Sequence, residues 1–429
     1  MKIGAIIAEY NPFHNGHHYQ MEKFRRDQHL DYIIVIMSGN FTQRGEPAWM
    51  PKHLRTRAAL MGGADLVLEL PVYYATGSAS LFAEGAIAHL NKLHCIDSLC
   101  FGCEIQENAA QKTDDIKDIE KLHRQKLEKA AAILVNEPPE FKRQLSDSLK
   151  KGLSYPAARA AALKGFIENP ELLSMPNNIL ALEYMTALKR AHSDIQPILI
   201  QRKGEGYHST NANEKFASAS AIRKSLDNSL LPNGPESIPE STWTGIPEEV
   251  RPILASSFQK EFPVRLDDFS GMFAAAFLRS MDQLTTYPDI SEDLANRMLR
   301  CFGHYQNLSS FLMEIKNKAY TYSRLCRCAS HILLEQNKEI LYQAKSEGYA
   351  FYARILGFQK SAAPLLSAIK SHSSIPLIGK MADYQKQLDG YGLELINADI
   401  RAADYYRTAL QMKYGHEMKN EFNRGIIII

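Results

Sequence analysis

The chain has 429 residues, of which 45% are hydrophobic and 23% are charged, an ordinary composition for a globular protein. Its formal net charge of +2 excludes a uniformly basic nucleic-acid binder, but a local basic face remains compatible because phosphate affinity depends on clustered charge. No apolar run reaches the roughly 20 residues that a membrane helix needs, so we expect no membrane association.

The cysteines and the first residues bear on the cellular compartment. A short apolar run leads straight into Asn11 and Pro12 without a small-residue cleavage site, which is not typical of a signal peptide. The six cysteines then predict a reducing cytoplasm. Cys95, Cys100 and Cys103 lie close together, and a zinc site is one interpretation. Their spacing suits a zinc knuckle poorly, so we favour buried or loop thiols and expect no protein metal site.

The first hundred residues alternate between strand and helix patterns. The predicted strands are Ile3–Ala8, Tyr32–Met37, Leu66–Leu70 and Ser98–Phe101, and the predicted helices are Gly16–Arg26, Lys52–Met61 and Ser78–Leu93. The run YIIVIM is continuously apolar, as expected for a parallel strand that is buried on both faces. Strands that alternate with helices predict an α/β fold with a doubly wound parallel sheet.

The composition changes between Gln106 and Gly165. This stretch is rich in Lys, Glu, Gln and Ala at helical spacing, which predicts a helical insertion packed on the α/β core. The core then resumes with a helix at Asn177–Arg190, a strand at Gln196–Gln201 and a helix that starts at Ser218–Leu226.

The second half of the chain has mostly helical patterns. Leu231–Glu249 contains four prolines and two glycines, a composition typical of a linker. Arg251–Phe422 carries apolar residues at three- and four-residue spacing with few strand runs, and the tail Ile426–Ile429 is expected to dock as an edge strand. The predicted domains are an α/β catalytic domain over residues 1–228, a linker over 229–250 and a mostly helical domain over 251–429.

The strongest local signal follows the first predicted strand, where His14, Asn15, Gly16 and His17 lead into a helix. A helix N-terminus offers free N–H groups and a partial positive charge that suit phosphate oxygens. Both histidines can donate hydrogen bonds to charge that develops on phosphoryl oxygens, and Gly16 removes a Cβ where a nucleotide approaches. Such a string also occurs by chance, but its position favours a triphosphate site with His14 and His17 as catalytic residues.

Two later segments carry further phosphate-binding candidates. Ser218 is expected to cap a helix that continues through Ser220 and Arg223, and these groups together suit a phosphate. A capped amphipathic helix without a ligand would show the same pattern. Arg202 ends a predicted strand at the carboxyl edge of the sheet, where ligands bind in open α/β folds, and its guanidinium can hold a phosphate by two parallel bonds.

Three weaker signals lie at other strand and helix ends. Gly102 ends the fourth predicted strand and leaves bare backbone for an adenine or a ribose. Asn177 opens a helix, where it either caps the helix or reaches a nucleotide. The loop Ser38–Pro51 contains glycines and Arg44, and is either an ordinary loop or a lid over an acceptor substrate.

At these residues the chain resembles the bacterial tRNA(Met) cytidine acetate ligases, which belong to the HxGH nucleotidyltransferase-like superfamily. The similar segments are IGAIIAEYNPFHNGHHYQ, MSGNFTQRGEPA, GADLVLELP, LCFGCE, PNNILALEYMTAL, IQRKGEGYHS, SRLCRCASHILL and DIRAADYYR. The resemblance implies that ATP and acetate form acetyl-adenylate and pyrophosphate, with Mg²⁺ expected. It further implies transfer of the acetyl group to the exocyclic N4 amine of the wobble cytidine of elongator tRNA(Met).

The resemblance also implies ATP contacts from one continuous segment and from Gly102, Asn177 and Arg202. The residues of that segment are Ile7, Ala8, Glu9, Tyr10, Asn11, Pro12, Phe13, His14, Asn15, Gly16, His17, His18, Tyr19 and Gln20. Cys103 stands where the family leads us to expect a small hydroxyl residue. A thiol is similar in size, so this departure concerns fine positioning only.

The sequence signal for RNA is weaker. Arg324, Arg327 and His331 lie three and four residues apart, so one helical face carries them, and Arg354 follows. Such a face can hold RNA phosphates, although a solvated helix surface has the same pattern. We expect tRNA and not DNA as the partner.

Two other functions remain open from the residues alone. One is a cofactor adenylyltransferase that makes a dinucleotide, although such an enzyme needs no helical second domain. The other is a non-catalytic protein that binds nucleotide and RNA, against which the intact His14, Gly16, His17 and Arg202 argue.

Overall fold

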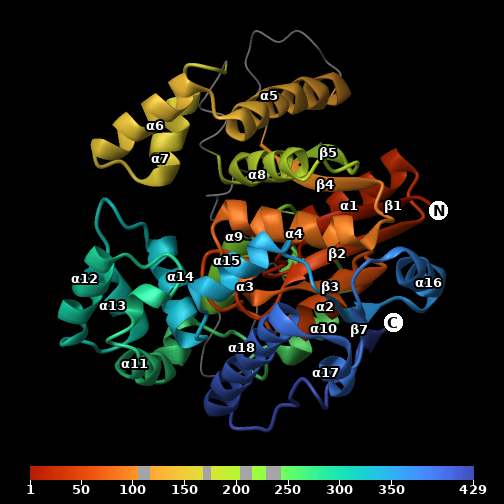
Figure 1. Ribbon diagram of the computed structural model, residues 1–429. Helices are drawn as coiled ribbons and strands as arrows, with labels where there is room; N and C mark the ends of the chain where they lie inside the picture. The colour runs from red at the N-terminus through yellow and green to blue at the C-terminus, as the bar shows by residue number, and fades with distance from the viewer. Residues whose placement is uncertain (105–115, 168–174, 203–214, 229–242) are drawn as a thin grey trace.

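The computed structural model describes residues 1–104, 116–167, 175–202, 215–228 and 243–429, and Figure 1 shows its arrangement. The strands are β1 Ile3–Ala8, β2 Tyr32–Ser38, β3 Leu66–Leu70, β4 Ser98–Cys103, β5 Gln196–Gln201, β6 Ala353–Phe358, β7 Leu377–Ile378 and β8 Ile427–Ile428. The helices up to the predicted linker are α1 Asn15–Gln28, α2 Lys52–Met61, α3 Val72–Ala75, α4 Ala79–Leu93, α5 Ile116–Asn136, α6 Pro139–Lys150, α7 Tyr155–Leu163, α8 Pro176–Arg190 and α9 Ala219–Asn228. The later helices are α10 Arg251–Ser257, α11 Ser270–Arg279, α12 Glu292–Phe302, α13 Leu308–Ile315, α14 Tyr322–Leu333, α15 Lys338–Ser346, α16 Ala363–His372, α17 Tyr384–Gln387 and α18 Gly390–Tyr414.

One sheet runs through the molecule in the order β5-β4-β1-β2-β3-β6-β7, and β8 also pairs with β6. The chain builds β1, β2 and β3 in one direction and then returns to add β4 and β5 on the other side of β1, all in parallel. The predicted doubly wound parallel sheet is therefore confirmed for these five strands. The strand order reverses between β1 and β4, which is where open α/β sheets bind their ligands.

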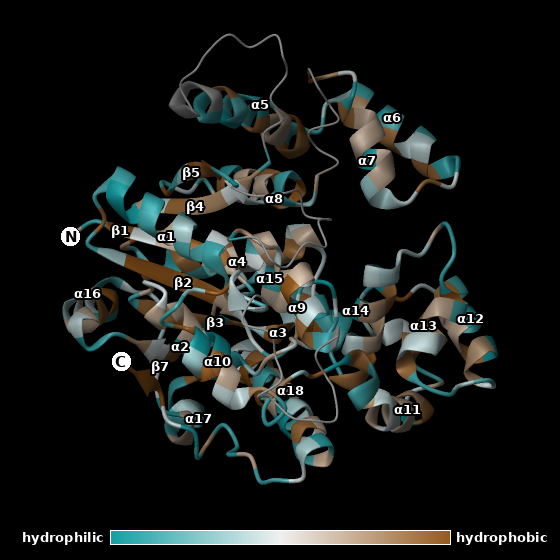
Figure 2. Cartoon of the chain, turned by 180° about the vertical axis from the view of Figure 1, so that it is seen from behind, coloured by the Kyte–Doolittle hydropathy of each residue, from teal (hydrophilic) through white to brown (hydrophobic). Residues whose placement is uncertain are grey.

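The apolar runs form strands because both faces of the sheet are covered. In β2, Ile34 and Ile36 face one hydrophobic core, whereas Ile33, Val35 and Met37 face the other. Side chains alternate along a strand, so a strand between two helical layers must be apolar at every position. Figure 2 shows the consequence, since the central strands are brown along their length and the outer helices mix teal with brown.

The second half of the chain supplies an edge of the same sheet, which its helical pattern did not predict. β6 lies antiparallel beside β3, with Leu66 opposite Phe358 and Glu69 opposite Arg354. The tail strand β8 pairs with β6 in parallel, which confirms that the C-terminal residues dock as a strand. The sheet is therefore mixed, and its antiparallel pair joins the two halves of the chain.

The remaining helices surround this sheet. Within the described part of the predicted insertion, α5, α6 and α7 are helical, and α5 packs on α8 and β5. In Figure 1, α6 and α7 lie beyond α5, and α11, α12 and α13 gather next to α14. Cys100 and Cys103 are free thiols buried on β4, as predicted. Among the residues that the structure describes, no helix is long and apolar enough to span a membrane.

Candidate active site

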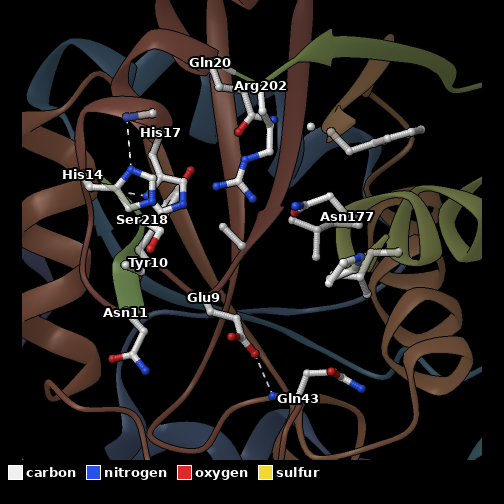
Figure 3. Close-up of a pocket in the computed structure, with 18 of the residues that line it drawn as sticks. Glu9, Tyr10, Asn11, His14, His17, Gln20, Gln43, Asn177, Arg202 and Ser218 are labelled. Carbon is white, nitrogen blue, oxygen red and sulfur yellow. Dashed lines mark hydrogen bonds between the residues drawn. The ribbon is translucent and has the colours of Figure 1, made fainter. Parts of the chain in front are cut away.

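A cavity of roughly 530 Å³ lies at the carboxyl ends of β1, β4 and β5, at the point where the strand order reverses. Figure 3 shows side chains around it from the segment that follows β1, from α1 and α8, and from the residues after β5 and before α9. The predicted residues that line this cavity are Ile7, Ala8, Glu9, Tyr10, Asn11, His14, Gly16, His17, Tyr19, Gln20, Gly102, Asn177, Arg202, Ser218, Ser220 and Arg223.

Four predicted ATP contacts lie outside the cavity lining, namely Pro12, Phe13, Asn15 and His18. The Phe13 ring is buried against Tyr10, with 5.0 Å between ring centroids. The Asn15 amide donates to two backbone carbonyls in the segments that precede α9 and α10, at 2.7 and 2.8 Å. His18 lies 3.2 Å from the Gly62 carbonyl on the outer side of α1. A turn followed by a helix directs successive side chains to different sides, so these residues support the segment instead.

The two cavity histidines form a reciprocal cap at the start of α1. His14 Nδ1 accepts a hydrogen bond from the Gly16 N–H at 3.0 Å, and His17 Nδ1 accepts one from the His14 N–H at 3.3 Å. Because each Nδ1 is an acceptor, the neutral rings carry their proton on Nε2. The rings stack with centroids 3.7 Å apart, and a Cβ on Gly16 would lie 2.9 Å from the His14 ring. Gly16 therefore makes room for His14 itself.

Both imidazoles are neutral at physiological pH. Burial, together with the nearby Arg202 and Arg223, lowers the pKa of His14 to about 3. Burial also holds the pKa of His17 well below its ordinary value, as do His14 and Arg202. A second positive charge beside a stacked imidazole in a cationic pocket is unfavourable. The histidines therefore offer N–H donors, and the positive charge comes from the arginines.

The start of α9 forms the other polar wall of the cavity. Ser218 Oγ accepts from the Ala221 N–H at 3.1 Å and lies 3.0 Å from Ser220 Oγ, which confirms Ser218 as the helix cap. Arg223 donates to the Asn11 carbonyl and so joins α9 to the end of β1. The wall combines hydroxyl groups, a helix N-terminus and a guanidinium, all of which favour an anion.

The ends of β4 and β5 place Arg202 over Gly102. A Cβ on Gly102 would lie 3.3 Å from Arg202 Cγ, so the glycine leaves room for the arginine stem. Asn178 is buried and holds the backbone of Glu104 by two hydrogen bonds, at 2.9 and 2.8 Å. Asn177 donates to a Glu104 carboxylate oxygen at 2.6 Å and lines the cavity. Asn177 does not cap its helix, because Met175 holds the cap position of α8.

The sequence reasoning missed Arg55, a fully buried cation that organises the site from behind. Its guanidinium donates to the carbonyls of Glu9 at 2.6 Å, Met50 at 3.0 Å and Ser38 at 3.1 Å, and also to that of Gly39. These carbonyls belong to the ends of β1 and β2 and to the loop after β2. Burial lowers the pKa of Arg55 to about 10, so it stays charged at neutral pH. Its helix, KHLRTRAALM, also carries Arg57, so the sequence offered no signal that singles out Arg55.

The loop after β2 is a wall of the cavity, since Thr42, Gln43, Arg44 and Glu46 line it together with Ser323 of α14. Arg55 binds both ends of this loop, so the loop is fixed in place and does not have the form of a free lid.

Two of the four predicted RNA contacts are wrong. His331 is 2% exposed, and its ring nitrogens lie 3.0 Å from the Pro288 carbonyl and 3.1 Å from the Thr76 carbonyl. Arg354 is 5% exposed and lies between Glu69 and Glu421. Both side chains therefore bond to other parts of the protein. Segments that are distant in the sequence cover the faces that the residue spacing had suggested to be exposed.

The other two predicted RNA contacts, Arg324 and Arg327, are half-buried on α14. Arg324 donates to the Asp289 carbonyl at 2.8 Å, and Arg327 pairs with the Asp289 carboxylate at 2.8 Å. Burial acts to raise the pKa of Asp289, but Arg327, His331 and Arg324 together hold that pKa below its usual value. A role in RNA binding remains a prediction for these two arginines.

With this geometry in place, similarity to known proteins identifies the family. The family model for HIGH Nucleotidyl Transferase matches residues 1–421. The chain belongs to this family. Its relatives include a tRNA(Met) cytidine acetate ligase from Thermoanaerobacter sp. (strain X514), 38% identical over 413 residues, or 95% of this chain and 96% of the relative. A protein of the same name from Acetivibrio thermocellus is 36% identical over 436 residues, which span all of both chains.

Solved structures of the family agree with the fold over its full length. Thermotoga maritima TmcAL without ligand superposes with a TM-score of 0.87 at 32% identity and covers 100% of both chains. The same protein bound with alpha-thio ATP gives a TM-score of 0.85 at 31% identity, again over the whole of both chains. The HIGH nucleotidyltransferase fold therefore extends through the α/β half and the mostly helical half of this chain.

Proposed function

We propose that the chain is an ATP-dependent tRNA(Met) cytidine acetate ligase. One observation carries the proposal: two neutral imidazole N–H donors, two arginines and the start of α9 converge in one cavity at the switch point of the sheet. This arrangement suits a triphosphate whose α-phosphorus is attacked. The names of the relatives supply the acyl group and the acceptor, which the cavity alone does not specify.

In the first step an acetate oxygen attacks the α-phosphorus of ATP, and pyrophosphate leaves. The Nε2–H groups of His14 and His17 lie where they can donate to the charge that develops on the phosphate oxygens. Arg202 and Arg223 bring positive charge to the same wall. Acetate is itself the nucleophile, so this step requires no protein nucleophile. The product is a mixed anhydride, and exclusion of water from the cavity would protect it.

In the second step the acetyl group passes to the N4 amine of the wobble cytidine of elongator tRNA(Met). The cavity reaches Ser323 at the start of α14, so the nucleotide site and the mostly helical half of the chain share a wall. That half is where we expect the tRNA to bind. A cytoplasmic location suits both the tRNA and the six free cysteines.

We expect Mg²⁺ to bind together with the triphosphate of ATP. Over the ranges that the structure describes, no three His, Cys, Asp or Glu side chains gather into a metal site. Mg²⁺ is ordinarily held by substrate phosphates and one or two carboxylates, which fits such a site. The steps above are carried by the chain's own residues.

The deciding experiment is mass spectrometry of cytidine in unmodified elongator tRNA(Met), after incubation with the protein, ATP, Mg²⁺ and acetate. We expect an added acetyl group that is absent without ATP. If AMP and pyrophosphate form with acetate but the tRNA is unchanged, the activation step stands and the acceptor is wrong. If ATP is untouched with acetate and related acids, the ligase proposal fails and a nucleotide-binding protein is favoured.

A further inference from the structure

The cavity has an acceptor end, which we define as Thr42, Gln43, Arg44, Glu46 and Ser323. The first four belong to a tight turn after β2. The Gly45 N–H donates to the Thr42 carbonyl at 2.8 Å, and the Thr42 N–H donates to the Glu46 carbonyl at 2.9 Å. A bridge between Phe41 and Pro47 closes the base of the turn.

Two contacts fix this turn between the nucleotide site and α14. The Gln43 N–H donates to Glu9 Oε1 at 2.7 Å, as Figure 3 shows, so the turn is joined to the end of β1. On its other side Gly45 packs on the backbone of α14, and its carbonyl accepts from Ser330 Oγ at 2.5 Å. The residue that follows Gly45 is Glu46, so its position is set from both sides.

Glu46 is a half-buried carboxylate that lines the cavity. Within the ranges that the structure describes, Thr42 donates to the backbone carbonyl of Glu46 but no residue donates a hydrogen bond to its carboxylate, whereas the Glu9 carboxylate already accepts one from Gln43. Burial raises the pKa of Glu46, while Arg223 and Arg44 act to lower it and Glu9 acts to raise it. The titratable and charged groups that face it are Arg223 of α9, Arg44 of its own turn, Glu9 at the end of β1, and Tyr322 and Cys326 of α14.

We propose that Glu46 is the general base of the acyl-transfer step, an inference that rests on the proposed function. The N4 amine of cytosine is a poor nucleophile because its lone pair is delocalised into the ring. As its nitrogen bonds to the acyl carbon, the bond from that carbon to the phosphate oxygen breaks and AMP leaves with the electron pair. The proton on the nitrogen passes to the Glu46 carboxylate, which has an open acceptor for it.

Glu46 lies on the side of the cavity from which the cytidine has to approach the acyl group. The histidines and the start of α9 hold the phosphate, so the cytidine must approach the acyl carbon from another side. The acceptor end supplies that side, and α14 forms part of it. A half-buried carboxylate with a raised pKa is a stronger base than a fully exposed one, which suits removal of an amine proton near pH 7.

The test separates the two steps in one preparation of enzyme. Acetate-dependent exchange of pyrophosphate into ATP reports activation, and acetylation of elongator tRNA(Met) reports transfer. We expect Glu46→Gln to keep exchange near the wild-type rate and to lose roughly 100-fold or more in the single-turnover rate of transfer. Glu46→Asp should retain part of the transfer rate. The matched control is Glu22→Gln on the outer side of α1, which should change neither step.

The pH dependence of the transfer rate is a second test, because loss of a residue with only a structural role would not change that dependence. The wild-type transfer rate should rise with pH as Glu46 ionises. This rise of the rate with pH should be absent in Glu46→Gln. Transfer at the wild-type rate in Glu46→Gln would overturn the inference, as would an equal loss of exchange and transfer. A wild-type enzyme without acetate-dependent exchange would overturn the proposed function and the inference together.

Discussion

His17 and His18 are neighbours with opposite surroundings, which makes them a matched pair. His17 directs Nε2–H into the cavity, whereas His18 faces Gly62, Glu22 and Glu249 on the outer side of α1. The donor from His17 is fixed before ATP arrives, because a backbone N–H holds its Nδ1. A donor fixed in advance costs no reorganisation when charge develops.

We expect His17→Ala to lower the rate of acetyl-adenylate formation roughly 100- to 1,000-fold, the usual effect of losing one fixed donor. The fold should survive even though the ring packs against Tyr10 and Phe13, because the ring also borders the cavity and not the sheet itself. Pyrophosphate exchange measures the rate, and circular dichroism checks the fold. His18→Ala should leave exchange unchanged. A folded His17→Ala enzyme with wild-type exchange would refute the role.

A second residue-scale prediction concerns His89, which is buried in α4 and lies 2.7 Å from the Gly85 carbonyl. Burial lowers its pKa to about 4, so the unfolded chain binds the proton more readily. The contribution to stability is complete above the unfolded pKa, near 6.5, and is lost as pH falls. Relative to His89→Phe, the wild type should lose on the order of 2 kcal/mol between pH 7 and pH 5. Urea unfolding at several pH values measures this, and a pH-independent difference would contradict it.

The sequence predicted where several site residues lie, but it did not show why those residue types are needed there. The position of His14 and His17 after the first strand was sufficient to predict the cavity. The reason for Gly16 was not readable, because it depends on how the His14 ring turns back over the helix start. His331 was misread, since spacing defines a helical face but does not show which distant segment covers that face. Arg55 was missed for the same reason, as its partners come from three separate segments.

At the scale of elements, the turn after β2 joins the cavity to α14 through Gly45. This residue has φ +79°, and a Cβ there would lie 2.2 Å from the Arg327 backbone nitrogen. Gly152 has nearly the same φ, +78°, but a Cβ there would meet no atom within 4 Å. The two glycines share the cost of a positive φ and differ in packing alone.

We therefore expect Gly45→Ala to reduce acyl transfer and thermal stability clearly more than Gly152→Ala does. The positive φ alone costs roughly 1–2 kcal/mol for an alanine, and both variants carry that cost. The further loss in Gly45→Ala comes from the clash with the α14 backbone, which displaces the turn. Thermal melts and single-turnover transfer assays measure the two effects. Equal behaviour of the two variants would show that the turn does not depend on this contact.

The elements themselves differed in how well the sequence predicted them. The first five strands are short, mainly apolar runs, and all five were predicted. β6, with the sequence ARILGF, was not, because Arg354 interrupts the run and reads as a surface cation. Its partners Glu69 and Glu421 are remote in the sequence, so only the folded chain shows that this arginine belongs inside.

For the whole molecule, one sheet and one ionic cluster join the two halves. Lys52 lies 2.7 Å from Glu69 and 2.9 Å from Glu421, and Arg354 contacts the same two carboxylates. All four side chains are nearly inaccessible to solvent. Burial would raise the pKa of Glu421, but Lys52 and Arg354 hold it well below its ordinary value. The cluster ties β3 and α2 to β6 and to the C-terminal tail.

Removal of one charge from this cluster should weaken the whole molecule. We expect Arg354→Met to lower the free energy of unfolding by about 3–5 kcal/mol, because Glu69 and Glu421 then remain buried with one cation fewer. Urea unfolding measures the loss, and Arg143→Met, in an exposed pair with Glu140, should leave the transition unchanged. If Arg354→Met does not fold, Glu421→Gln serves instead, since it leaves Arg354 paired with Glu69. Because the sheet passes through both halves, the loss should appear as a shift of one cooperative transition. Separation into two transitions, with the catalytic half unaffected, would show that the two halves fold independently and that the shared sheet does not couple them.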